Sequence, residues 1–138
     1  MSFWAARRRI VHVLVLVLCL VGLIPAAHME RKSRKAARGA LMEASVVQTR
    51  RARVFGRMSN STAGIAYYVA LGVASFFLTS PAVWPAACIA AVAAALLSAY
   101  LAYSLAFVTR MPCAYCWTGH LINWALLAAV LAAHGAPA

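Results

Sequence analysis

Four apolar stretches follow one another along the chain, separated by polar or proline-containing segments. They cover residues 10–27, 63–79, 86–108 and 113–133. A transmembrane helix needs about 20 apolar residues at a rise of about 1.5 Å per residue, so the shorter stretches must stand nearly upright or use flanking residues. Four such segments with almost no charge inside them leave nothing polar to cover them in water. The pattern therefore predicts an all-α membrane protein, a bundle of four transmembrane helices that forms a single domain over residues 1–138.

The composition of the chain excludes an ordinary soluble domain. Hydrophobic residues make up 65% of the sequence, charged residues only 11%, and the mean hydropathy is +0.83. The first stretch follows Arg7, Arg8 and Arg9 and ends in two alanines, so it also imitates a secretory signal peptide. Its length favours a retained membrane helix. The third stretch is rich in alanine, and small residues let helices approach closely in lipid.

The connector between the first two stretches, residues 28–62, carries most of the charge. The chain has 13 Lys and Arg residues against two acidic ones, a net charge of +11, and nine of the 13 lie in this connector. In a soluble protein this charge would suggest nucleic acid, but beside membrane segments phospholipid headgroups are the expected counter-ions, and no nucleic-acid partner is expected. Residues 29–43 are predicted to form a basic interfacial helix that lies flat on the bilayer. The alternative is a solvated charge run that touches the headgroups without specificity.

Two cysteines, Cys113 and Cys116, stand three residues apart where the fourth stretch begins. Pro112 marks the helix start and so places Cys113 near the cap, where unpaired backbone N–H groups and the helix dipole favour a thiolate. A thiolate is the nucleophile in thiol–disulfide exchange, and this spacing lets the two sulfurs close into a disulfide within one turn. The same motif also makes half a zinc site. The other cysteines, Cys19 and Cys88, are expected to be buried packing residues.

Helical spacing extends the cysteine pair into a polar stripe. Cys113, Cys116, His120 and Asn123 are separated by three, four and three residues and therefore share one face of the helix. Hydrocarbon does not tolerate such a face, so it must point into the bundle, where polar groups are functional candidates. His120 is alternatively a packed histidine bonded to a neighbouring backbone, and Asn123 is expected to bond another helix. A metal site would need a fourth ligand from elsewhere, and none is indicated.

A pair that forms disulfides inside a membrane must pass two electrons to a lipid-soluble acceptor, and a quinone fits this role. Apolar and aromatic walls can hold its ring while polar side chains bond the carbonyl oxygens, which gain negative charge as electrons arrive. Asn60 and Ser61 precede the second stretch, level with the cysteines, and either can contact the quinone opposite His120. Tyr67 and Tyr68 are candidate walls, although aromatic residues at a membrane boundary are usually interfacial anchors.

These residues give the chain a resemblance to the vitamin K epoxide reductase family, the membrane thiol oxidoreductases that couple disulfide formation to quinone reduction. The matching segments are CAYCWTGHLIN at residues 113–123, RVF at 53–55 and NSTAG at 60–64. The resemblance implies a four-helix bundle around a quinone pocket. The implied acceptor is a quinone of the ubiquinone, menaquinone or vitamin K type.

The family's roles fall on four positions of this sequence. Cys116 is expected to face the quinone, and Cys113 to exchange with the thiol donor, which is a thioredoxin-like protein or a substrate thiol. Asn60 is expected to hydrogen-bond the quinone, with a second contact at the position of His120. That position is a tyrosine in the vertebrate enzymes, so His120 is a departure that can alter the choice of quinone.

The connector departs from the family, which typically carries two further cysteines there that shuttle electrons to the membrane pair. Glu43 and Arg51 stand about where those cysteines are expected, and the segment between RVF and NSTAG is short, so the lid over the pocket should be reduced. Either a thiol partner reaches Cys113 directly, or the disulfide cycle is lost and the protein is a non-catalytic subunit of a larger membrane complex. Retention of the cysteine pair, Asn60 and His120 favours the enzyme.

The orientation of the cysteine pair in the membrane rests on two conflicting indications. Four spans put the connector and Arg110 on one side, with ten Lys and Arg residues there against three opposite, which points to the cytoplasm by the positive-inside rule. The cytosol, however, keeps thiols reduced. The family generally turns the pair to the periplasm or lumen, although some archaeal homologues are inverted. We therefore expect the extracytoplasmic side of a plasma, inner or endomembrane.

Overall fold

Helices make up most of the protein. The computed structural model describes residues 2–42, 45–54 and 58–134. Its α-helices are α1 (Phe3–Ala37), α2 (Asn60–Ala74), α3 (Val83–Tyr103) and α4 (Ala114–His134). The shorter elements are the 3-10 turns η1 (Val46–Gln48), η2 (Arg50–Ala52) and η3 (Ser75–Phe77), the antiparallel strands β1 (Arg53–Val54) and β2 (Met58–Ser59), and the π-helical segment η4 (Ser104–Thr109).

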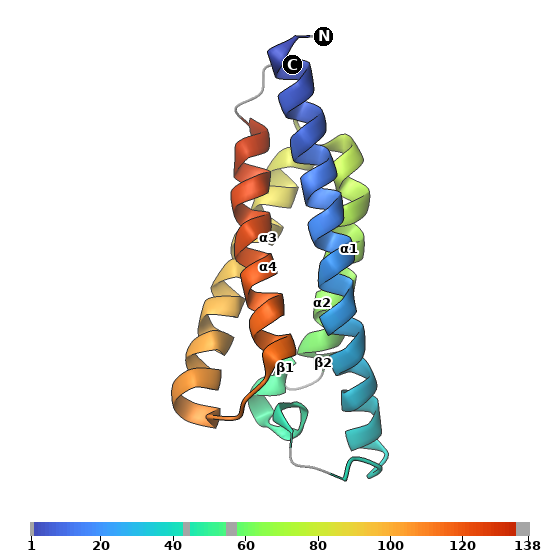
Figure 1. Cartoon of the computed structure of the whole chain (residues 1–138), viewed down its shortest axis with the longest axis vertical. Coiled ribbons are helices and arrows are strands. Elements are labelled where there is room, and N and C mark those ends of the chain that lie inside the picture. Colours follow the sequence, from blue (N-terminus) through green and yellow to red (C-terminus); the bar gives the residue numbers. More distant parts are fainter. Residues whose placement is uncertain (1, 43–44, 55–57, 135–138) are drawn as a thin grey trace.

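The four α-helices lie roughly side by side along the long axis of the molecule (Figure 1). The start of α1 and the end of α4 lie at one end of the bundle, and the connector with its two strands lies at the other, near the start of α4. α1 packs against α2 and α4, and α4 also packs against α3, whereas α2 and α3 make few contacts with each other. The side between α2 and α3 is therefore the least tightly closed side of the bundle.

α1 is longer than the sequence pattern predicts. The predicted helix covers residues 10–27, but α1 begins at Phe3 and ends at Ala37. Residues 28–37 are mostly arginine, lysine and alanine, which are good helix formers, so they extend α1 instead of starting a new helix. The separate basic helix predicted over residues 29–43 is thereby corrected, because its first nine residues belong to α1.

The other three helices begin close to their predicted starts. α2 begins at Asn60, three residues earlier than predicted, because Ser59 caps it and its hydroxyl accepts a hydrogen bond from the Thr62 N–H at 3.2 Å. α3 also begins three residues early, at Val83, and passes into η4 at its far end. α4 covers Ala114–His134, one residue later than predicted at both ends.

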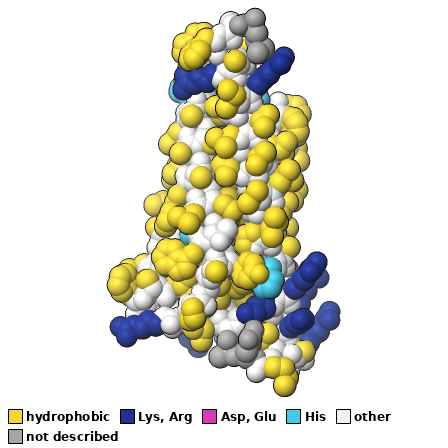
Figure 2. All heavy atoms as spheres, in the orientation of Figure 1, with side chains coloured by type: hydrophobic (Ala, Val, Ile, Leu, Met, Phe, Trp, Pro, Cys, Tyr) yellow, Lys and Arg dark blue, Asp and Glu magenta, His cyan; other side chains and the backbone are white. Residues whose placement is uncertain are grey.

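The outer surface of the bundle is apolar along its middle. Figure 2 shows hydrophobic side chains over the length of the helices, with Lys and Arg gathered toward the two ends. Exposed side chains of α1 include Val17, Leu20 and Ile24. In the described part of the chain, α1, α4, and α3 together with η4 are long and apolar enough to cross a membrane. The protein is therefore an integral membrane protein, while α2, with 15 residues, is shorter than these three helices.

Small residues bring the helices of the bundle close together, as the alanine content predicts. The buried positions of α3 are all alanine or serine: Ala87, Ala91, Ala95, Ser98 and Ala102. Between α1 and α2 the close contact is made at Gly22, where a Cβ would lie 2.7 Å from the Tyr68 ring. The Tyr68 hydroxyl in turn donates a hydrogen bond of 2.8 Å to Asn123 Oδ1 on α4. This chain of contacts fixes α1, α2 and α4 relative to one another.

Candidate functional site

A cavity of about 220 Å³ lies between the helices near the connector. All four α-helices and the turns η1 and η2 contribute to its lining. Most of the wall is apolar, including Pro25, Ala63, Leu97 and Leu101. Ligand pockets for drug-sized molecules usually measure roughly 300–1,000 Å³, so this cavity lies somewhat below that range.

Cys113 and Cys116 are joined in a disulfide at the start of α4. Their Cα atoms lie 5.3 Å apart, within the usual range for a disulfide. Cys113 takes the capping position, because its Sγ accepts a hydrogen bond from the Cys116 N–H (3.2 Å) and its carbonyl accepts one from the Trp117 N–H (3.2 Å). The two remaining cysteines are free: Cys19 is buried, as predicted, and Cys88 is only half-buried.

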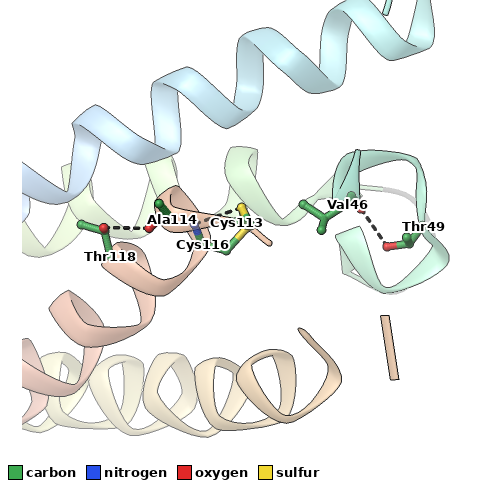
Figure 3. Close-up of a disulfide and its surroundings, with 6 residues drawn as sticks. All are labelled: Val46, Thr49, Cys113, Ala114, Cys116 and Thr118. Carbon is green, nitrogen blue, oxygen red and sulfur yellow. Dashed lines mark hydrogen bonds between the residues drawn. A yellow bond between two sulfur atoms is a disulfide. The ribbon is translucent and has the colours of Figure 1, made fainter. Parts of the chain in front are cut away.

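The two sulfurs of the disulfide differ in their surroundings. Cys116 lines the cavity, whereas Cys113 is not part of its wall. Figure 3 shows the disulfide between the first turn of α4 and the connector turn that carries Val46 and Thr49. Val46 and Thr49 also line the cavity, so this turn covers the end of the cavity at which the disulfide lies. The two cysteines therefore differ in position: Cys116 belongs to the cavity wall and Cys113 does not.

His120 lies one turn beyond Cys116 and also lines the cavity. Its side chain is buried, with 7% exposed, and its ring meets the edge of Trp117 at a centroid distance of 6.2 Å. No described residue forms a hydrogen bond with the ring, so the predicted alternative of a histidine bonded to a neighbouring backbone is not what the described structure contains. The described residues also contain no group of three or more His, Cys, Asp or Glu side chains that could hold a metal ion.

Asn123, the last member of the predicted stripe, bonds other helices, as expected. Its Oδ1 accepts a hydrogen bond from the Tyr68 hydroxyl of α2 at 2.8 Å, and its Nδ2 donates one to the Ser98 hydroxyl of α3 at 2.7 Å. Asn123 therefore joins three helices at the wall of the cavity. Cys116 and His120 are the members of the stripe that line the cavity without such bonds between helices.

Asn60 lines the cavity from the first residue of α2. Its Nδ2 donates a hydrogen bond to the Arg51 carbonyl at 2.7 Å, which leaves one of its two amide hydrogens available. Ser61, the other predicted candidate for a contact with the quinone, donates its hydroxyl proton to Glu30 at 2.8 Å. Of these two residues, Asn60 therefore has the free donor.

The beginning of α2 is held by Glu30, which sequence reasoning missed. Glu30 Oε2 accepts hydrogen bonds from the hydroxyls of Ser59, Ser61 and Thr62, at 2.7 to 2.9 Å, and Oε1 accepts one from Arg34 Nε at 3.1 Å. A carboxylate at this position also complements the positive end of the α2 dipole. The rarity of acidic residues in so basic a chain is the signal that could have identified it.

Glu30 lies beyond the apolar part of α1, and its contacts determine its ionisation. Partial burial raises the pKa of the carboxyl, but hydrogen bonds from Thr62, Ser61, Ser59 and Arg34 outweigh burial and lower the pKa to about 2. Because the pKa is lower in the folded protein than its ordinary value of 4.5, the stabilisation is fully present above that value. It is lost as the pH falls from there toward 2.

Replacing Glu30 by glutamine is therefore expected to destabilise the protein at neutral pH by about 1–3 kcal/mol, because the half-buried and exposed hydroxyl donors lose a charged acceptor. Thermal unfolding in detergent, followed by circular dichroism, measures the change. The difference from the wild type should shrink as the pH falls below 4.5. Arg34→Gln is the matched control, because it removes only the ion pair with an exposed arginine and should cost at most about 0.5 kcal/mol. Equal losses of stability in both variants would contradict a stabilising role for the three hydroxyl groups that donate to Glu30.

Arg51, which stands about where the family carries a shuttle cysteine, attaches the connector to α3. Its guanidinium donates a hydrogen bond to the Ser104 hydroxyl and lies 5.4 Å from the centre of the Tyr100 ring. Its carbonyl holds Asn60, and its side chain lines the cavity. These contacts hold this part of the connector against α3 and η4 without a covalent bond. Glu43 lies outside the described residues, as does the phenylalanine of the RVF segment.

The structure also brings together His28 and Tyr115, which sequence reasoning did not connect. Their rings stack at a centroid distance of 4.0 Å and an angle of 18° between their planes. Tyr115 lies between the two cysteines and lines the cavity, as do Tyr67 and Tyr68, the predicted walls. His28 follows the apolar part of α1, so this stack ties α1 to the first turn of α4.

Comparison with known protein families identifies one match. The model described as "Vitamin K epoxide reductase family" matches residues 13–131, which extend from the apolar part of α1 nearly to the end of α4. The match covers the connector, the cavity and the disulfide. No curated protein matches the chain.

Proposed function

The chain belongs to the vitamin K epoxide reductase family, and on that premise we propose that it passes electrons from a protein thiol through Cys113 and Cys116 to a quinone. Membership of the family indicates a membrane thiol–disulfide oxidoreductase that works with a quinone. The observation that carries the proposal is the position of Cys116, on the wall of an apolar cavity that also contains His120 and Asn60.

The cavity fits the ring of a quinone of the ubiquinone, menaquinone or vitamin K type. Its walls are mostly apolar, and its volume of about 220 Å³ suits the ring and not an isoprenoid tail. Asn60 has a free amide hydrogen, and the His120 ring has no hydrogen bond to any described residue. Both can therefore donate to the carbonyl oxygens. In this proposal the tail leaves the cavity between α2 and α3, the neighbouring helices with the fewest contacts.

The proposed cycle begins at Cys113, because Cys113 lies outside the cavity wall whereas Cys116 belongs to it. A thiolate of the donor, which is a thioredoxin-like protein or a substrate thiol, attacks Cys113 Sγ and breaks the disulfide, releasing Cys116 as a thiolate. A second donor thiol then displaces Cys113, so that the donor leaves oxidised and the pair is reduced. The absence of cysteines from the connector favours this direct attack.

Oxidation of the pair completes the cycle. A bound quinone supplies the acceptor for two electrons and two protons and leaves as the quinol. Cys116 Sγ lies at the cavity, so electrons leave the protein through it as the bond to Cys113 Sγ re-forms. His120 and Asn60 would each donate an N–H group to the carbonyl oxygens, where negative charge develops. The two protons lost by the thiols balance the two gained by the acceptor.

The orientation of the site is part of the proposal. With α2 and η3 as a fourth span, the connector, the end of η4 and the start of α4 lie on one side of the membrane. We place that side outside the cytoplasm, in keeping with the family and with the need to maintain a disulfide. Labelling of reduced protein in sealed vesicles with a membrane-impermeant maleimide tests this placement.

Mass spectrometry of alkylated protein tests the proposed function. After reduction, all four cysteines are expected to react with maleimide under denaturing conditions, and addition of a quinone before alkylation should protect only Cys113 and Cys116. Cys19 and Cys88 serve as internal controls. A pair that stays reduced under excess quinone, in protein that co-purifies with a larger complex, would instead support a non-catalytic subunit.

A further inference from the structure

The hydroxyl of Tyr67 takes part in none of the contacts described above. The hydroxyl oxygen is buried, and no described residue forms a hydrogen bond with it. The side chain lines the cavity that contains Cys116. Buried polar groups in proteins are nearly always hydrogen-bonded, so an unpaired hydroxyl in the wall of a cavity indicates a partner that enters the cavity.

The neighbouring Tyr68 shows what a structural tyrosine in this helix does. Its ring lies 5.4 Å from that of Tyr67, but its hydroxyl donates to Asn123 Oδ1 at 2.8 Å and is thereby used in packing. Tyr68 is 3% exposed and belongs to the core. Of the two adjacent tyrosines, only Tyr68 has a hydrogen-bond partner for its hydroxyl among the described residues.

Tyr67 is also well placed relative to Asn60. The two residues are seven apart in α2, which is two helical turns, so they share one face of the helix. Side chains of a helix generally lean toward its N-terminus, which in α2 is the end that Asn60 begins. Both line the same cavity.

We propose that the Tyr67 hydroxyl donates a hydrogen bond to a carbonyl oxygen of the quinone. This inference rests on the proposed function and adds a third donor to Asn60 and His120. A carbonyl oxygen has two lone pairs, so two oxygens can accept from three donors. The hydrogen bond would hold the quinone ring in the cavity and fix its orientation. Cys116 and Cys113 supply the electrons.

Tyr67→Phe tests this assignment, because it removes only the hydroxyl. With a short-chain benzoquinone and with 2-methyl-1,4-naphthoquinone as probes, the dissociation constant is expected to rise about tenfold, equivalent to about 1.4 kcal/mol. The infrared carbonyl band of the bound probe should shift to higher frequency as the bond is lost. The ligand-free protein should unfold at the same temperature as the wild type or a higher one, because an unsatisfied buried group is removed.

Tyr68→Phe is the matched control. It removes the donor to Asn123, so its ligand-free unfolding temperature should fall, with a smaller change in quinone affinity than in Tyr67→Phe. An unchanged dissociation constant and carbonyl band in Tyr67→Phe would overturn the assignment and indicate that the hydroxyl bonds water. If the wild-type pair is reoxidised by quinone in that case, the proposed function stands without it. A wild type that neither binds the probes nor is reoxidised by them overturns both.

Discussion

Cys116→Ser is expected to reduce thiol-dependent quinone reduction to the background rate, a loss of at least about 1,000-fold on the scale seen when a covalent catalytic group is removed. Cys116 is the cysteine on the cavity wall, so without it no sulfur is placed to pass electrons to a bound acceptor. The measurement is the quinone absorbance in reconstituted membranes with dithiothreitol as electron donor. Serine keeps the size of the side chain and should leave the fold intact.

Cys88→Ser is the control for this experiment, because Cys88 is a free cysteine outside the cavity wall and its loss should leave the rate unchanged. Cys113→Ser should also abolish turnover, since the remaining Cys116 thiol cannot close a disulfide. Activity that persists in Cys116→Ser would reject the mechanism. Function that survives Cys113→Ser, together with stable co-purification of a larger complex, would support the assembly role.

The sequence predicted the helices well where the pattern was apolar, and less well where it was charged. The starts of α2, α3 and α4 lie close to those expected from hydropathy, because burial in lipid dominates the choice of structure there. α2 and α3 end five residues before the predicted ends and continue into η3 and η4. Residues 28–37 are polar, and nothing local decides whether they form a separate helix or extend α1. These residues extend α1, because most of them are good helix formers and they follow the helix directly.

The sequence also indicated the residues of α4 that line the cavity, since helical spacing alone places Cys116, His120 and Asn123 on one face. The contacts that support the site were beyond such reasoning. Glu30 meets the start of α2 about 30 residues later in the chain, and Arg51 meets Ser104 more than 50 residues later. No periodicity links such distant segments, because their proximity arises only when the helices pack together.

His120→Leu is expected to lower kcat/KM for quinone reduction by about 100-fold, the usual effect of removing one donor that stabilises developing negative charge. His120 lies one turn from Cys116 on the cavity wall, and its ring has no hydrogen bond to any described residue. The donor is therefore available to the acceptor. Leucine keeps much of the volume and removes the N–H groups, so the loss should appear mainly in kcat. Stopped-flow absorbance with reduced protein measures it directly.

His120→Tyr separates the donor from the packing of the ring. The phenol occupies the same position on α4 and supplies an O–H, so we expect it to recover most of the rate lost in His120→Leu, with a changed preference among benzoquinones and naphthoquinones. Both variants should keep the Cys113–Cys116 disulfide and the bond between Tyr68 and Asn123, because neither involves the imidazole. A rate for His120→Leu within threefold of the wild-type rate would show that reduction of the quinone does not depend on this side chain. Stabilisation of the charge on the quinone would then rest on Asn60 and Tyr67.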